Sequence, residues 1–149
     1  MNFPSNFGRD TSRSTGFLFI RAYNHWHTQV KHQLKKIDLT HPQFVVLTAV
    51  GYLSSPDEEV FQVNIATLAD IDVMTVSQIL KLLEKKALVS RAIAKNDPRA
   101  KAISLTKAGQ AKLEMALPIV ENIDATFFAN LSEPELFQQA LQELTKEDD

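Results

Sequence analysis

Apolar residues return along this chain at two spacings, one typical of helices and the other of strands. In the first long segment Ile20, Tyr23, His27, Val30 and Leu34 recur every three or four positions, which places them on one side of a helix. The segment from residue 44 to 53 is almost continuously apolar and predicts a buried helix. The predicted helices cover residues 15–37, 41–53, 65–70, 73–86, 107–130 and a last segment from about 134.

Short polar residues that can accept a hydrogen bond from a free backbone N–H mark the predicted helix starts. Thr40 with Gln43, and Ser132 with Glu135, have the spacing of capping boxes. The other predicted caps are Asn64, Asp72 and Thr106. Residues 60–63 predict a short strand, and residues 88–93 and 101–105 predict two strands joined by the loop 95–101.

The order of these elements predicts a mainly α fold with a small β-hairpin. Two short helices followed by a hairpin are typical of a winged helix-turn-helix, which places one helix in the DNA major groove and the hairpin loop, or wing, beside it. The predicted DNA-binding region is residues 38–106. The helices of residues 1–37 and 107–149 remain as a second, helical region, and both regions form one intertwined domain.

Charge is distributed very unevenly along the chain. The 149 residues carry a net charge of only −2. Residues 75–112 nevertheless hold nine Lys and Arg against two acids, a net +7, whereas residues 113–149 carry −8 and residues 1–74 carry −1. A local basic patch determines the field where a nucleic acid docks, so the near-neutral total is compatible with DNA binding.

Composition excludes several other classes of protein. The chain has no cysteine, which excludes disulfides and thiolate metal sites within it. It has no stretch near the roughly 20 apolar residues of a membrane span and no secretory signal pattern, so we expect a cytoplasmic protein. It has only four glycines, no phosphate-binding loop and no nucleophile motif, so we expect no enzymatic activity and no cofactor.

The candidate DNA contacts lie on the second short helix and on the hairpin. Opposite the apolar stripe of residues 73–86, the polar side offers Thr75, Ser77, Gln78 and Lys81. Gln suits adenine and Lys suits guanine in the major groove. In the hairpin, we expect Arg99 to enter the minor groove, because its planar, always charged head suits that narrow groove.

The other charged hairpin residues have simpler expected roles. Lys95 and Lys101 are predicted phosphate contacts, and Asp97 is predicted to hold the turn through its own backbone or to orient an arginine. Arg91 could pair with Asp97 or reach a phosphate. Lys112 is expected to be an ordinary solvated charge.

Four stretches together resemble the MarR family of bacterial transcriptional regulators. They are residues 39–47, 75–84, 88–91 and above all 96–109, where an acid and an arginine in the wing precede a Leu-Thr-x-x-Gly helix start. Two positions depart from the family pattern. Lys86-Ala87 stands where the family commonly has a glycine after the recognition helix, and Gln78 stands where it often has an arginine.

The resemblance implies a homodimer whose first and last two helices form the dimer region. It also implies binding to inverted repeats in double-stranded promoter DNA, usually as a repressor, with release by a small aromatic or anionic effector. The residues in places comparable to an effector pocket are Arg21, Tyr23, Asn24, His27, His41 and Phe44.

Two alternatives from other classes are left open. The first is a winged-helix module that binds protein, as an anti-repressor does, although such a module does not need the +7 block. The second is a metal sensor built on histidines. The spacing of His25, His27 and His32 on the first helix does not place them in one cluster, so no metal site is predicted.

Overall fold

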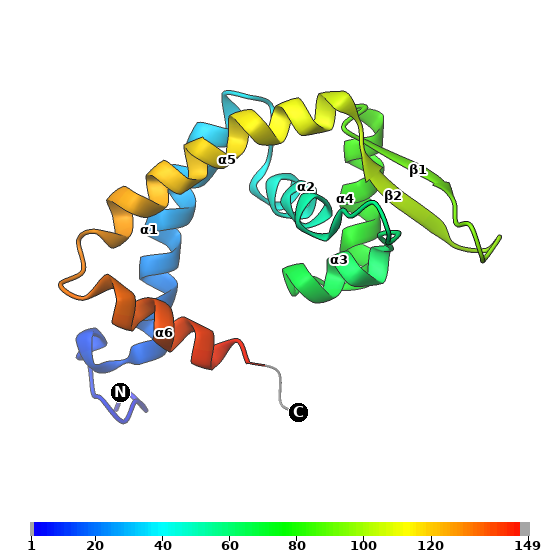
Figure 1. Ribbon diagram of the computed structural model, residues 1–149. Coiled ribbons are helices and arrows are strands. Elements are labelled where there is room, and N and C mark those ends of the chain that lie inside the picture. The colour runs from blue at the N-terminus through cyan, green and yellow to red at the C-terminus, as the bar shows by residue number, and fades with distance from the viewer. Residues whose placement is uncertain (1, 147–149) are drawn as a thin grey trace. The chain divides into compact units, whose positions relative to one another are not determined.

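The computed structural model describes residues 2–146 as six α-helices, one short 3-10 helix and a two-stranded antiparallel hairpin (Figure 1). The elements are η1 (Thr11–Arg13), α1 (Thr15–Lys35), α2 (His41–Leu53), α3 (Gln62–Ala69), α4 (Val73–Lys85), β1 (Val89–Ile93), β2 (Lys101–Leu105), α5 (Lys107–Phe128) and α6 (Pro134–Leu144). The mainly α fold with a hairpin is therefore confirmed. No single helix of the described residues is long and apolar enough to cross a membrane.

The chain divides into two compact units. Unit 1 holds residues 1–29 and 120–149, and unit 2 holds residues 30–119. The sequence predicted a different division, into a DNA-binding region of residues 38–106 and a dimer region on either side of it. That functional division remains a prediction.

Unit 2 contains α2, α3, α4 and the hairpin around one apolar core. Leu47 and Val50 of α2, Ile65 of α3, and Leu80 and Leu83 of α4 are fully buried. The helices α3 and α4 meet at a bend of 111°, within the range of roughly 90–120° found for helix-turn-helix motifs. The register of the hairpin pairs Val89 with Leu105 and Ile93 with Lys101.

The predicted caps Thr40, Asp72 and Thr106 are confirmed. Thr40 and Gln43 form the predicted capping box at α2. Asp72 accepts a hydrogen bond from the backbone N–H of Thr75 and caps α4. Thr106 accepts one from Gly109 N–H at the start of α5.

Three local predictions were wrong. Residues 60–63 form no strand, because Val60 makes a single backbone hydrogen bond to Ile103 and α3 already begins at Gln62. Asn64 is therefore the third residue inside α3, where its side chain accepts from Phe61 N–H. At α6 the N-cap is Glu133, without a side-chain capping bond, so the Ser132 capping box does not form.

Unit 1 has a small buried core and a large exposed apolar surface. The indole N–H of Trp26 on α1 donates to a carboxylate oxygen of Asp124 on α5 over 2.7 Å. The rings of Phe127, Phe128 and Phe137 contact one another. The exposed apolar side chains of α1 and α6 include Phe17, Leu18, Phe19, Ile20, Tyr23, Leu136 and Leu144.

Candidate nucleic-acid interface

The helix α4 presents a polar face because its apolar residues follow one stripe. Val76, Ile79, Leu80 and Leu83 point into the core of unit 2 and are buried. On the opposite side Thr75, Gln78 and Lys81 are exposed, and Ser77 is half-buried. The polar side of α4 is therefore open to a ligand from Thr75 through Gln78 to Lys81.

Asp72 fixes the first turn of this helix. Its carboxylate accepts from the hydroxyl and from the backbone N–H of Thr75, and these bonds, the hydroxyl one first, lower the pKa of Asp72 below its ordinary value of 3.8. The Thr75 hydroxyl thus donates within the protein and has its acceptor lone pairs left for a base.

Met74 is a feature of this face that the contacts predicted from sequence did not include. Its side chain lies in the first turn of α4 and is 75% exposed, which is unusual for a large apolar residue. The first turn is the part of a recognition helix that meets base edges. The sequence signal for Met74 was an apolar residue on the polar side of the first turn of α4.

The turn after α4 is built without the glycine that the family commonly has. Ala87 takes a left-handed conformation with φ of 61°. Its N–H bonds to the carbonyl of Glu84 and the N–H of Leu88 bonds to the carbonyl of Leu83, the two bonds of a Schellman motif. This turn delivers the chain from α4 directly into β1.

The Leu-Thr-x-x-Gly sequence anchors α5 on that same turn. The Thr106 hydroxyl donates to the carbonyl of Ala87 over 2.6 Å, and its backbone N–H donates to the carbonyl of Leu88 over 3.1 Å. A Cβ atom on Gly109 would lie 1.9 Å from the Leu88 carbonyl oxygen, so only glycine fits. The motif therefore fixes the base of the hairpin relative to α4.

In the wing, Asp97 holds the loop in shape. Its side chain accepts from Arg99 N–H over 2.9 Å, and its carbonyl accepts from Ala100 N–H over 3.2 Å. The predicted structural role of Asp97 is confirmed. The side chains of Lys95, Arg99 and Lys101 are all exposed around this loop.

Arg91 links the hairpin to the helix rather than to the loop. Its Nε lies 3.1 Å from a carboxylate oxygen of Glu84 on α4, and its side chain is only 15% exposed. The pairing of Arg91 with Asp97 was wrong, because Asp97 serves the loop backbone. A phosphate contact by Arg91 stays a prediction.

Two lysines of the basic block have internal partners. Lys86 donates to the carbonyl of Asp38 and to the side chain of Gln43. Lys112 donates to the carbonyl of Ile37 over 2.8 Å, so the prediction of a solvated Lys112 was wrong. The exposed bases of the block are Lys81, Lys85, Lys95, Arg99, Lys101 and Lys107.

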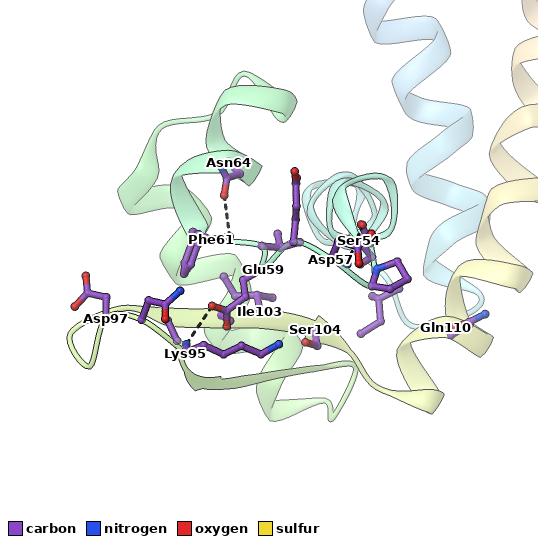
Figure 2. Close-up of a pocket in the computed structure, with 18 residues that line it drawn as sticks. Ser54, Asp57, Glu59, Phe61, Asn64, Lys95, Asp97, Ile103, Ser104 and Gln110 are labelled. Atoms are coloured by element: carbon purple, nitrogen blue, oxygen red, sulfur yellow. Dashed lines mark hydrogen bonds between the residues drawn. The ribbon is translucent and has the colours of Figure 1, made fainter.

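A hollow of about 1030 Å³ lies beside the wing (Figure 2). Residues 54–61, which connect α2 to α3, form one wall of the hollow, and the hairpin forms the other. Glu59 accepts from the backbone N–H of Lys95 in this hollow over 3.1 Å.

The predicted effector residues fall into both units. In unit 1, Tyr23 stacks on His27 with ring centroids 5.3 Å apart. In unit 2, His41 and Phe44 are buried and stack at 6.5 Å. Arg21 and Asn24 are exposed on α1, and the grouping of all six residues in one pocket remains a prediction. Within residues 2–146, no group of three or more His, Asp or Glu side chains is placed to hold a metal ion.

The fold and the exposed basic wing beside α4 define the class: a winged helix-turn-helix, DNA-binding transcriptional regulator. A family model described as transcriptional regulator SarA/Rot matches residues 29–115, and the chain belongs to this family.

Relatives and solved structures agree with this assignment. The HTH-type transcriptional regulator YdcH of Bacillus subtilis is 41% identical over 133 residues, which cover 89% of this chain and 90% of that protein. The structure of Bordetella bronchiseptica BpsR, whose DNA binding is regulated by 6-hydroxynicotinic acid, is 25% identical with a TM-score of 0.83 over 98% of this chain and 100% of that one. Escherichia coli MarR with operator DNA shares the fold, at 22% identity and a TM-score of 0.79 over 88% of this chain and 93% of that one. The fold that the resemblance to MarR regulators implies is confirmed.

Proposed function

We propose that this regulator is a homodimeric repressor, acting in the cytoplasm, that binds an inverted-repeat operator and is released by a small aromatic or anionic molecule. The observation that carries the proposal is the juxtaposition in unit 2 of an exposed polar face on α4 and an exposed basic wing. The Arg91–Glu84 ion pair joins the hairpin and the helix. A two-part contact with one duplex needs this fixed arrangement.

Each residue of this surface has a role in the proposed complex. Gln78 contacts adenine and Lys81 contacts guanine in the major groove, with Thr75 and Ser77 beside them. Arg99 enters the minor groove, whose negative potential attracts a guanidinium group. Lys95, Lys101 and Arg91 contact phosphates, which position the protein without reading sequence.

The proposal of a dimer is supported by the apolar surface of unit 1. Exposed apolar patches of this kind mark interaction sites in soluble proteins. The partner in the proposal is a second copy, because two identical recognition helices match the two halves of an inverted repeat spaced about one helical turn, roughly 34 Å, apart.

The proposal of an effector is supported by the similarity to BpsR, since the 6-hydroxynicotinic acid that regulates that protein is an aromatic acid. In this chain the candidate residues are Arg21, Tyr23, Asn24, His27, His41 and Phe44. Aromatic walls with a few polar groups suit such a molecule.

Titration of a selected duplex at several salt concentrations tests the DNA-binding part of the proposal. Sites are first selected from random duplexes with the full chain. Bound Lys and Arg release counterions, so the logarithm of the binding constant should fall with the logarithm of salt by about 0.9 for each phosphate neutralised. A flat salt dependence, or no enriched sequence after selection, would instead favour a protein-binding module.

A further inference from the structure

Glu59 places a carboxylate against the start of the basic wing loop. It lies in the segment between α2 and α3, and its Oε1 atom accepts from the backbone N–H of Lys95 over 3.1 Å (Figure 2). Lys95 is the first residue of the wing loop. A carboxylate next to a surface that contacts phosphates weakens DNA binding by repulsion. A structural contribution of the same carboxylate would offset this cost.

The same segment holds the hairpin at a second point. The carbonyl of Val60 accepts from the backbone N–H of Ile103 on β2 over 2.8 Å. Successive residues, Glu59 and Val60, therefore bond the start of the loop and the strand that follows it. The wing is attached on both sides to the chain that leads into α3.

Inside the loop the hydrogen bonds are local. Arg99 N–H and Ala100 N–H both bond to Asp97, and Ala94 N–H bonds to the carbonyl of Ala100. These bonds shape the tip but do not fix it relative to the helices. Among the residues that the structure describes, Glu59 is the one side chain from outside the hairpin that hydrogen-bonds residues 94–100.

We infer that Glu59 is a positioning residue for DNA binding. Its carboxylate holds the start of the loop, so that Arg99 and Lys95 are presented at a fixed distance from α4. Without it the loop moves about its base, and binding must then order it at an entropic cost. This inference rests on the proposed DNA-binding function, because it names a residue that the proposed contacts depend on.

Three variants of the full chain separate position from charge. Glu59→Ala removes the acceptor and one negative charge. Glu58→Ala removes the same charge from the neighbouring exposed residue, whose side chain does not hold the wing. Glu59→Gln removes the charge but keeps a side-chain oxygen that can accept from Lys95 N–H.

The affinities for a selected duplex should rank in a definite order. We expect Glu59→Ala to bind about fivefold more weakly than Glu58→Ala, which corresponds to about 1 kcal/mol, the typical net contribution of one hydrogen bond. Glu59→Gln should bind at least as tightly as Glu58→Ala. Equal affinities for the two alanine variants, or a Glu59→Gln variant as weak as Glu59→Ala, would overturn the inference.

Amide exchange of the free protein gives a readout that does not depend on DNA. The Lys95 amide should exchange faster in Glu59→Ala than in Glu58→Ala and stay protected in Glu59→Gln, while amides of the α2 core remain unchanged. If no variant, nor the wild type, binds DNA specifically, the proposed function fails. In that case the exchange rate of the Lys95 amide alone decides whether Glu59 holds the wing: faster exchange in Glu59→Ala supports the attachment, and an unchanged rate contradicts it.

Discussion

At the scale of single residues, Ala87 keeps a backbone conformation that its side chain disfavours. A left-handed conformation costs an L-residue with a Cβ atom roughly 1–2 kcal/mol. The Schellman bonds to Leu83 and Glu84 hold it in place. The family's usual glycine would adopt the same φ of 61° without strain.

We therefore predict that Ala87→Gly stabilises the protein. Part of the relieved strain is offset by the greater freedom of glycine in the unfolded chain, so the expected net gain in the free energy of unfolding is about 0.5–1 kcal/mol. Denaturant midpoints measure it. The control is Ala111→Gly at an exposed position inside α5, which should lose about 1 kcal/mol. Destabilisation by both substitutions would contradict the strain at Ala87.

Because the pKa of Asp72 is lowered in the folded protein, the stabilisation by this residue should depend on pH. A carboxylate whose pKa is lower in the folded state stabilises the protein at pH values above its ordinary pKa, which is 3.8 for Asp72. This contribution is lost as the pH falls through the pKa of the folded state. Asp72→Asn keeps a capping oxygen but does not titrate. The wild type should have the higher Tm at neutral pH, and the difference should shrink on acidification below 3.8. A pH-independent difference would show that the charge has no part in capping.

At the scale of elements, local signals in the sequence were sufficient for most of unit 2. The apolar stripe of α4 and the caps Thr40, Asp72 and Thr106 act within one or two turns, so a short window of sequence contains their cause. The polar side of α4 followed from the same stripe. This is why the candidate base contacts could be predicted from the order of residues alone.

Several predictions failed because they depend on how separate elements pack against one another. Residues 60–63 have strand-like composition, but whether they pair depends on how the hairpin approaches, and only Val60 reaches it. Lys112 meets the carbonyl of Ile37 across 75 positions, and Arg91 meets Glu84 only because α4 packs on β1. No periodicity in the sequence carries this information.

The wing and α4 should make separable contributions to DNA recognition. We predict that Arg99→Ala weakens binding to all duplexes by roughly 1–3 kcal/mol, while Gln78→Ala loses a similar amount only at one base position in each half-site. Competition titrations with single-base variants of a selected site measure both effects. Lys107→Ala, which removes an exposed charge at the start of α5, is the control and should change affinity little. Affinities within about twofold for both test variants would contradict the contact assignment.

At the scale of the whole molecule, the two units differ in how well each one buries its own apolar residues. In unit 2 each of the helices α2, α3 and α4 contributes fully buried apolar side chains, such as Leu47, Ile65 and Leu80, to one core. In unit 1, Phe19 on α1 and Leu136 on α6 are each 55% exposed, and α6 has no buried residue. A hollow of about 510 Å³ in this unit is lined almost wholly by apolar side chains, among them Trp26 and Phe137. An exposed apolar surface of this kind marks an interaction site, which in the proposed function is the contact with a second copy.

We accordingly predict that Leu136→Glu disrupts the proposed dimer. A buried leucine contributes about 1.5–3 kcal/mol, and two copies lie in a symmetric interface, so dimer dissociation should become at least about tenfold more favourable. Sedimentation velocity over a concentration series measures this. Gln138→Glu adds the same charge to α6 at an exposed polar position on the opposite side of the helix from Leu136, and should leave the dimer intact. Loss of the dimer should also weaken DNA binding, because a monomer has only one recognition helix. Leu136→Glu should bind a full inverted repeat no better than a single half-site, and a variant that remains dimeric would remove α6 from the interface.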